Sequence, residues 1–367
     1  MKWSWKIARL AGIDVHVHVT FFLLLYLVGI SYWNEYGTLA AVVSGVGFIL
    51  ALFSCVILHE LGHSLTARQY GIRTRNITLL PIGGVAALER MPEDPLQEIK
   101  VALAGPMVNF VIAAVLFFFL DGPIEVPPSG LLSLTDGSFA YRLMILNIFL
   151  GGFNLLPAFP MDGGRVLRAV LALRMDHAMA TERAAAVGKM LALVMGLVGW
   201  FYNPFLIFIA VFIWFGASME NNSEQLKLSL DQVRVRDAML KEFHTLSPED
   251  NLAKAVTLTL AGSQKDFPVG SQGGLQKVLH HSDLIKGLQE HGELARISDL
   301  QLADLISVEG GELLETVLQR MQGNVAQMMH VTEGGHTIGL LNLENIVEVI
   351  KIHEALHQHA GRAQHGY

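Results

Sequence analysis

The chain has 367 residues, of which 52% are hydrophobic and 16% are charged, and its net charge is -7 at pH 7. The length favours two or three domains, and an acidic chain without a Lys/Arg-rich run excludes most nucleic-acid-binding proteins. More than half of the charges follow residue 220, so we expect a membrane domain over 1–220 and a soluble region after it. The single cysteine, Cys55, excludes an internal disulfide framework.

The N-terminal residues are expected to lead into a membrane span. Lys2, Lys6 and Arg9 precede an apolar run that is long and lacks a small-residue cleavage site, which distinguishes it from a cleaved signal peptide. The alternation of Val15 and Val17 predicts a short strand just before this run. We therefore expect the run to remain in the protein as the first span.

Long apolar stretches predict a polytopic α-helical membrane protein with about six transmembrane helices. The segment from Ile72 to Arg90 is too broken by Pro81, Gly83 and Gly84 to be one of them, so a strand-like or re-entrant loop is expected there. A further loop is expected over 121–138. The six expected spans cover residues 19–32, 41–67, 99–120, 140–154, 186–201 and 204–219.

Basic residues predict the orientation of these spans. Segments 1–10, 66–100 and 165–189 carry 3, 5 and 5 Lys or Arg residues, whereas the loop 121–138 carries none. By the positive-inside rule the N-terminus and the region after the last span are cytoplasmic. We expect a multi-pass protein of a prokaryotic plasma membrane.

The second span ends in His59-Glu60-Leu61-Gly62-His63. Histidines four residues apart lie on one face of a helix, where a single metal ion can bind both. A catalytic zinc takes three protein ligands. Asp162 is the best third ligand, because it lies at the membrane depth of His63, in a broken helix, and glycines follow it.

This set of residues predicts hydrolysis of a peptide bond with Zn²⁺ as cofactor. Glu60 would take a proton from the attacking water and pass it to the departing amine. The Asn154 amide is a candidate for stabilising the oxyanion, and the alternative is that it satisfies backbone groups freed by Pro157. Gly83 and Gly84 lie in a loop that could offer a strand edge to an extended substrate, and the alternative is a simple turn.

A second H-E-x-x-H motif occurs at His353-Glu354-Ala355-Leu356-His357. It lies in a polar, His-rich C-terminal tail, 353–367, outside any apolar span. A short motif needs its structural context to carry meaning, so we interpret this copy as a chance match.

The first motif and the broken helix resemble the site-2 protease family of intramembrane zinc metalloproteases, whose signatures are H-E-x-x-H and N-x-x-P-x-P-x-x-D-G. Residues 154–163 keep the asparagine, both prolines and the Asp-Gly ending, with one residue more between the prolines. Ala104-Gly105-Pro106-Met107-Val108-Asn109 is similar to the family's A-G-P-x-x-N stretch. The resemblance covers about residues 10–220 and implies regulated intramembrane proteolysis of a membrane-anchored regulatory protein.

The C-terminal region follows a polar segment, 221–234, that we expect to be a linker. Two similar units over 235–290 and 291–352 alternate helix and strand patterns, which predicts an α/β repeat. They resemble a tandem CBS pair, which implies binding of an adenine nucleotide (ATP or AMP), homo-oligomer formation and control of cleavage. In that family the closing acid contacts a ribose, so Asp283 and Glu344 are candidates, and the alternative is a helix-capping acid.

Two other functions fit the sequence less well than proteolysis. A non-proteolytic membrane nucleotide sensor or transporter with an inactive site would be expected to have lost Glu60 or Asp162, and both are present. A solute channel would call for polar residues along several spans, but here they gather at one end. The sequence therefore favours the enzyme.

Overall fold

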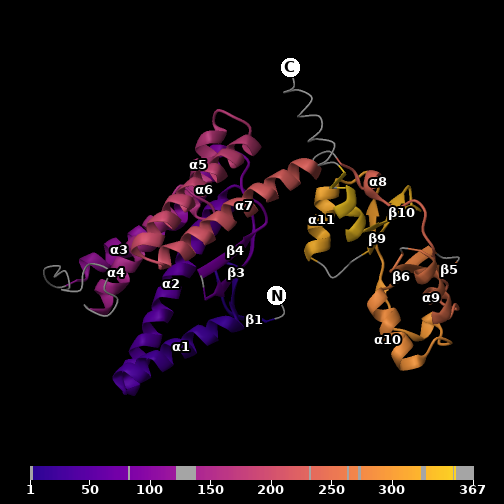
Figure 1. Ribbon diagram of the computed structural model, residues 1–367, viewed down its shortest axis with the longest axis horizontal. Helices are drawn as coiled ribbons and strands as arrows, with labels where there is room; N and C mark the ends of the chain where they lie inside the picture. Colours follow the sequence, from indigo (N-terminus) through magenta and orange to yellow (C-terminus); the bar gives the residue numbers. More distant parts are fainter. Residues whose placement is uncertain are drawn as a thin grey trace. The chain divides into compact units, whose positions relative to one another are not determined.

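The protein is described by a computed structural model that covers residues 3–81, 83–120, 138–230, 233–262, 264–271, 274–323, 328–349 and 351–352. The second H-E-x-x-H motif, the tail around it and most of the 121–138 loop lie outside the described residues. The chain divides into two units, Met1–Glu224 and Gln225–Tyr367, which are taken one at a time (Figure 1).

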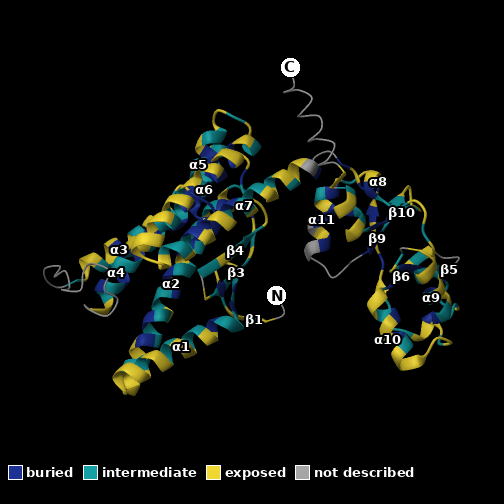
Figure 2. Ribbon diagram, viewed as in Figure 1, coloured by how far each residue is buried: buried dark blue, intermediate teal, exposed yellow. Residues whose placement is uncertain are grey.

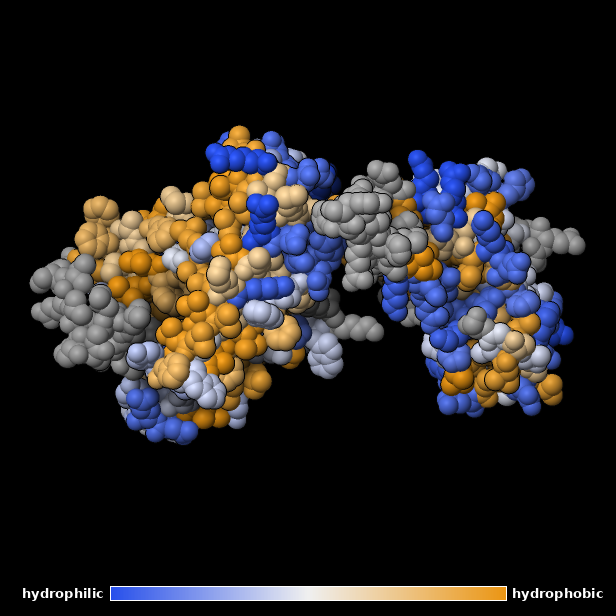
Figure 3. All heavy atoms as spheres, turned by 45° about the horizontal axis from the view of Figure 1, so that its top comes forward, coloured by the Kyte–Doolittle hydropathy of each residue, from blue (hydrophilic) through white to orange (hydrophobic). Residues whose placement is uncertain are grey.

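The first unit is largely helical. Among the described residues, four helices are long and apolar enough to cross a membrane, α2, α3, α6 and α7. Large apolar side chains such as Trp200 and Phe208 are exposed on them. Figure 2 shows exposed residues along these helices, and Figure 3 shows a broad hydrophobic surface, as expected of a lipid-facing protein. The helices are α1 (Val19–Tyr36), α2 (Leu39–Gln69), α3 (Pro95–Phe118), α4 (Phe139–Asn154), α5 (Asp162–Ala172), α6 (His177–Tyr202) and α7 (Phe205–Leu230).

The polytopic helical architecture is confirmed, and the helices coincide with the expected spans. Where we expected the first and fourth spans, α1 has 18 residues and α4 has 16. A helix needs about 20 apolar residues to cross a bilayer without help from its flanks. The total of six spans therefore stays a prediction.

Local sequence signals set the boundaries of the helices that carry the site. Thr38 caps α2 by accepting a hydrogen bond from the Ala41 amide, and Asp94 caps α3 just before Pro95, a favoured first helical residue. The predicted break after α4 is present, since residues 155–161 are not helical. The prolines in this segment cannot donate to a helix, and α5 begins directly after it.

A four-stranded sheet completes the first unit, in the order β1-β2-β3-β4. The strand predicted before α1 is β2, and the broken segment 72–90 is the β3–β4 hairpin, so its strand-like character is confirmed. The outermost strand on the N-terminal side was not expected, because its mostly exposed residues show no two-residue alternation. Only the β2–β3 pairing is parallel, and the strands are β1 (Ser4–Leu10), β2 (Ile13–His18), β3 (Thr74–Leu80) and β4 (Gly83–Leu88).

The second unit has the α/β repeat that the sequence predicted. Its two three-stranded sheets have the orders β5-β6-β7 and β10-β9-β8, and each lies beside an apolar cluster of its own. The strands are β5 (Phe267–Ser271), β6 (Gly274–Leu279), β7 (Ala303–Asp304), β8 (Ile306–Glu309), β9 (Met328–Glu333) and β10 (His336–Asn342), and the helices are α8 (Val235–Ala238), α9 (Leu252–Ala261), α10 (His281–His291) and α11 (Leu314–Gly323).

The polar segment that we expected to be a linker differs from that expectation. It is helical as far as Leu230, because α7 continues through it. Leu230 and Val233 are buried in the same apolar cluster as Val235 and Leu314 of the second unit. The segment is polar overall, but its apolar residues at 226, 230 and 233 pack on that cluster, which a free linker would not do.

Candidate active site

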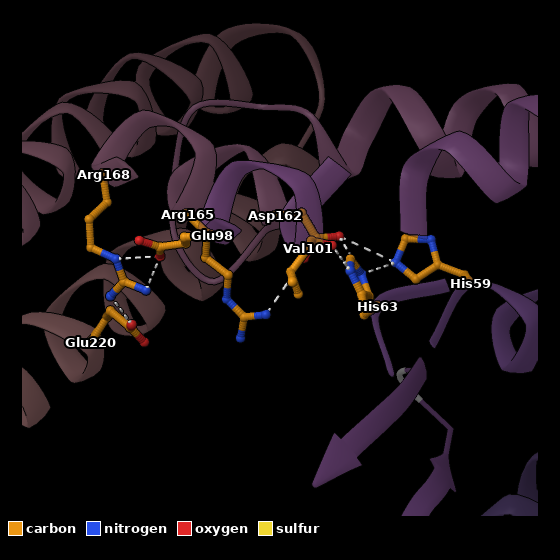
Figure 4. A network of polar contacts seen from close by, with 8 residues as sticks. All are labelled: His59, His63, Glu98, Val101, Asp162, Arg165, Arg168 and Glu220. Atoms are coloured by element: carbon orange, nitrogen blue, oxygen red, sulfur yellow. Dashed lines mark hydrogen bonds and ion pairs between the residues drawn. The ribbon is translucent and has the colours of Figure 1, made fainter. Parts of the chain in front are cut away.

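Two histidines and an aspartate converge where α2 meets the start of α5. The Nε2 atoms of His59 and His63 lie 3.1 Å apart, and Asp162 Oδ2 lies 3.3 Å from the first and 3.1 Å from the second. All three residues are buried, and their ligand atoms lie within 4.8 Å of one another (Figure 4). The structure thus brings together the three residues that the sequence singled out, although 99 positions separate His63 from Asp162.

Hydrogen bonds on the far side of each ring fix the two imidazoles. His59 Nδ1 lies 2.5 Å from Asn109 Oδ1, and His63 Nδ1 lies 2.7 Å from the Val101 carbonyl oxygen. Because both partners are acceptors, each Nδ1 carries the proton and each Nε2 keeps its lone pair. The two lone pairs and a carboxylate oxygen therefore face a common point, which is the donor set of a metal site.

The contact behind His59 extends through two further helices. Asn109 Nδ2 on α3 donates to Asn147 Oδ1 on α4 at 3.0 Å, and Asn147 Nδ2 donates to the Leu143 carbonyl at 2.8 Å. Both asparagines are buried. In the sequence, Asn109 stands out only as part of the A-G-P-x-x-N stretch, and Asn147 belongs to no motif. The available signal was that polar residues inside apolar spans are expensive and usually functional.

Gly105 on α3 lies directly against the two imidazole rings, where there is no room for a side chain. A Cβ atom at this position would lie 2.2 Å from His63 Nε2 and 2.7 Å from His59 Nε2. Any side chain here would occupy the point toward which the ligand atoms face.

A cavity of about 600 Å³ opens beside this point. Its wall includes Glu60, which is half-buried, as well as Arg165 and Asn154. Arg165 Nη1 lies 3.7 Å from Asp162 Oδ1, the carboxylate oxygen turned away from the histidines. Asn154 Nδ2 donates to the Leu150 carbonyl at 3.0 Å, a backbone-satisfying bond, and its second amide proton is left for another acceptor.

The β3–β4 hairpin brings two glycines to the same cavity. Gly83 and Gly84 both line it, and a Cβ at Gly84 would lie 2.9 Å from Glu60 Cγ. In the sheet order, β4 is an edge strand. Its outer edge therefore has backbone groups that no described strand of this sheet pairs with.

A larger cavity of about 1240 Å³ lies in the second unit. Asp283, Lys277 and His280 line it, and Lys277 Nζ lies 2.6 Å from Asp304 Oδ1. Asp283 lies in the first turn of α10, whose N-cap residue is His280. At this end of the helix Asp266 Oδ1 accepts from the His281 amide at 2.9 Å.

The His280 side chain lines the same cavity and pairs with Asp266 at 3.2 Å. This hydrogen bond raises the pKa of His280 above its ordinary value of 6.5. Glu344, by contrast, does not line the large cavity. It pairs with Lys265 at 2.8 Å and borders a smaller one of about 390 Å³.

Comparison with known proteins defines the class. The chain is 32% identical to zinc metalloprotease MJ0392 of Methanocaldococcus jannaschii over 96% of its length and 98% of that protein. It is 29% identical to the putative zinc metalloprotease Rip3 of Mycobacterium tuberculosis, covering 96% of this chain and 94% of the other. The protein is therefore an integral membrane zinc metalloprotease.

The family follows from the first of these relatives, which is 32% identical over almost its whole length. The model of peptidase family M50 matches residues 47–122 and 119–198. A solved site-2 protease from Methanocaldococcus jannaschii has 39% sequence identity, covers 60% of this chain and 95% of that one, and gives a TM-score of 0.43. The second unit is similar to a CBS domain of a bacterial CNNM/CorC family Mg²⁺ transporter that was solved with ATP. The match covers 35% of this chain and 96% of that one, at 22% sequence identity and a TM-score of 0.32. The chain belongs to peptidase family M50, the site-2 protease family.

Proposed function

We propose that this protein cleaves a membrane-anchored regulatory protein within or next to its transmembrane helix. In this proposal His59, His63 and Asp162 hold the zinc ion and Glu60 is the general base. The observation that carries it is the convergence of three ligand atoms within 4.8 Å at the wall of a cavity that Glu60 also lines.

The residues fit a zinc ion of the catalytic kind. Two neutral imidazoles and one carboxylate are a recurrent catalytic set of three protein ligands, which leaves one position open. Zinc bound there supplies Lewis acidity, which activates water and polarises a carbonyl group. Glu60 takes a proton from the attacking water and returns it to the amine nitrogen as the peptide C–N bond breaks. Asn154 directs its second amide proton to the carbonyl oxygen of the substrate.

The substrate segment binds in extended form along β4. A peptide bond inside a helix is shielded by its own hydrogen bonds, so the substrate must unwind before it is cut. An edge strand compensates the unwound segment by pairing with its backbone. Gly84 supports this arrangement, because its lack of a side chain keeps the strand close to Glu60.

The second unit regulates this activity by binding an adenine nucleotide in its large cavity. Lys277 and His280 supply cationic groups for phosphates, and Asp283 accepts from a ribose hydroxyl. In this proposal the unit also joins chains into a homo-oligomer. With the orientation predicted from the basic residues, both the N-terminus and this unit lie in the cytoplasm of a prokaryotic cell.

Co-expression with a panel of tagged single-span regulators tests the proposal. Wild type is compared with Glu60→Gln and with the matched change Glu354→Gln in the second motif. We expect wild type and Glu354→Gln to cut a substrate that Glu60→Gln leaves intact. Cleavage by Glu60→Gln would refute the assignment of the base, and zinc-loaded wild type that cuts no member of the panel would favour a non-proteolytic sensor.

A further inference from the structure

A cluster of charged side chains joins α3, α5 and α7 of the first unit beside the site, and His177 of α6 lies at its edge, 3.6 Å from Glu98 Oε2. Arg168 on α5 donates to Glu98 Oε1 on α3 through Nε at 2.8 Å and through Nη2 at 2.5 Å. Its Nη1 donates to Glu220 Oε1 on α7 at 2.6 Å. Arg168 is 2% exposed and Glu98 is 0% exposed. Figure 4 shows the three side chains in line with Arg165 and Asp162.

The chemistry of this cluster favours positioning over simple stability. Buried ion pairs are costly to desolvate, and apolar side chains of similar size often stabilise a fold as well or better. A guanidinium differs from an ammonium in its rigid fork, which fixes direction as well as distance. Arg168 uses that fork to hold α5 against α3 and α7 at once.

The helix that Arg168 holds is the one that carries a proposed metal ligand. Asp162 is the first residue of α5, six residues before Arg168, or about 9 Å along the axis. α5 is only 11 residues long and is separated from α4 by the non-helical segment 155–161. Its position therefore depends on side-chain contacts, because no preceding helix continues into it.

The third member of the cluster lies on a helix that reaches the second unit. Glu220 is ten residues before Leu230, or about 15 Å along α7. Leu230 is 2% exposed and belongs to the apolar cluster of the second unit. Because α7 is continuous from Glu220 to Leu230, it is the covalent route by which a change in that cluster can reach Glu220.

We propose that the Glu98–Arg168–Glu220 cluster positions Asp162 for the metal, and that α7 transmits the state of the second unit to the metal centre through Glu220. This inference rests on the proposed function, in which Asp162 is a zinc ligand. Glu98, Arg168 and Glu220 are positioning residues, because each acts on the metal site through α5.

Zinc release from the full-length protein tests the positioning step. Zinc-loaded protein in nanodiscs is mixed with a chromophoric chelator, and the release rate is compared between wild type and Glu220→Gln. The control is Glu182→Gln, which removes an exposed carboxylate of α6 outside the cluster. We expect Glu220→Gln to release zinc about tenfold faster, the lower end of the effect of removing groups behind metal ligands, and Glu182→Gln to change the rate little.

Equal release rates from the Glu220 and Glu182 variants would overturn the positioning role. If Glu220→Gln does not yield folded protein, Glu220→Asp is compared with Glu182→Asp, since both keep the charge and shorten the side chain by one methylene. The measurement needs no substrate, so it separates the two proposals. A wild type that cleaves and binds zinc with unaffected Glu220 variants refutes this inference alone, whereas a wild type that binds no zinc refutes both.

A double-mutant cycle tests transmission through α7. Residues this far apart normally act independently. We expect Leu230→Ala to change the rate of zinc release when Glu220 is intact. In the Glu220→Gln background, we expect the same substitution to change that rate little. Leu252→Ala, in a different apolar cluster of the second unit, is the control and should act alike in both backgrounds. If the effects of Leu230→Ala and Glu220→Gln simply multiply, the route through Glu220 is wrong.

Discussion

Asn109 Oδ1 accepts a hydrogen bond from His59 Nδ1 at 2.5 Å, on the side of the imidazole opposite Asp162. The contact leaves His59 Nε2 as the atom that faces Asp162. Asn109 is held in turn by Asn147. The orientation of this histidine is thus set by helices α3 and α4 as well as by its own helix.

Replacing Asn109 should therefore weaken metal binding. Asn109→Leu removes the acceptor for the His59 Nδ1 proton, and we expect zinc affinity to fall about 10- to 100-fold. Asn109→Asp keeps an acceptor at that point and should lose less. Competition with a chelator of known affinity measures both, and equal losses would show that the hydrogen bond to His59 is not the cause.

Gly105→Ala should prevent metal binding altogether. The added methyl carbon would lie 2.2 Å from His63 Nε2, so at least one ligand atom must leave its place. Gly47→Ala is the control, because a Cβ there meets nothing within 4 Å. The zinc content of purified protein is the readout, and a Gly105→Ala protein with full zinc would contradict the site geometry.

Gly84→Ala should slow cleavage without removing the metal. Its Cβ would lie 2.9 Å from Glu60 Cγ, which displaces the proposed base or moves the strand away from it. Gly47→Ala, at a position where a Cβ meets nothing within 4 Å, should leave the rate nearly unchanged. The cleavage rate and the zinc content are measured on the same preparation. A loss of zinc in parallel with the loss of rate would show that the substitution disrupts the metal site rather than the position of Glu60.

The two candidate acids of the second unit should differ in their effect on nucleotide binding. Asp283 lines the large cavity, whereas Glu344 pairs with Lys265 outside it. We expect Asp283→Ala to lower the affinity for AMP or ATP about tenfold, since one hydrogen bond to a charged acceptor is lost. Calorimetry with the full-length protein measures this. A larger loss with Glu344→Gln would place the site elsewhere.

The His280–Asp266 pair should make the second unit sensitive to pH. Its hydrogen bond raises the pKa of His280 above 6.5, so the stability it contributes is complete below pH 6.5 and is lost as the pH rises through the raised value. Burial raises the pKa of Asp266, but hydrogen bonds from His280 and His281 outweigh it and leave the value below 3.8. The carboxylate's contribution is therefore present above pH 3.8 and is lost at lower pH.

Hydrogen exchange of α10 in the full-length protein checks this expectation. After correction for the intrinsic exchange rate, protection should decrease at alkaline pH by on the order of 1 kcal/mol. His280→Gln should flatten the dependence. A wild-type profile that is already flat would show that the pair contributes no net stability.

The membrane spans and the three converging residues could be predicted from the sequence, because each of them has a recognisable local pattern. Apolar runs predict helices, and the spacing of His59 and His63 places them on one face. Asp162 could be chosen from its depth and its broken helix. The prediction of a linker was wrong because the segment near Leu230 has a polar composition. That composition gave no sign that the segment is helical or that its apolar residues pack on a cluster elsewhere in the chain.

The contacts that support the site could not be predicted in the same way. Asn109, Asn147 and Arg168 act across helices that are distant in sequence, and nothing in the spacing of one helix indicates which side chain of another it will meet. What the sequence offered was only that these polar residues lie within or beside apolar segments. Their partners depend on how α3, α4, α5 and α7 pack.

The continuity of α7 decides where this protein can be divided. A soluble fragment that starts at residue 235 would leave behind Leu226, Leu230 and Val233, which cover the apolar cluster of the second unit. Their loss would expose that cluster to water and favour aggregation. A fragment intended for crystallisation or for nucleotide binding should begin within the last three turns of α7, so that it takes part of the transmembrane helix with it.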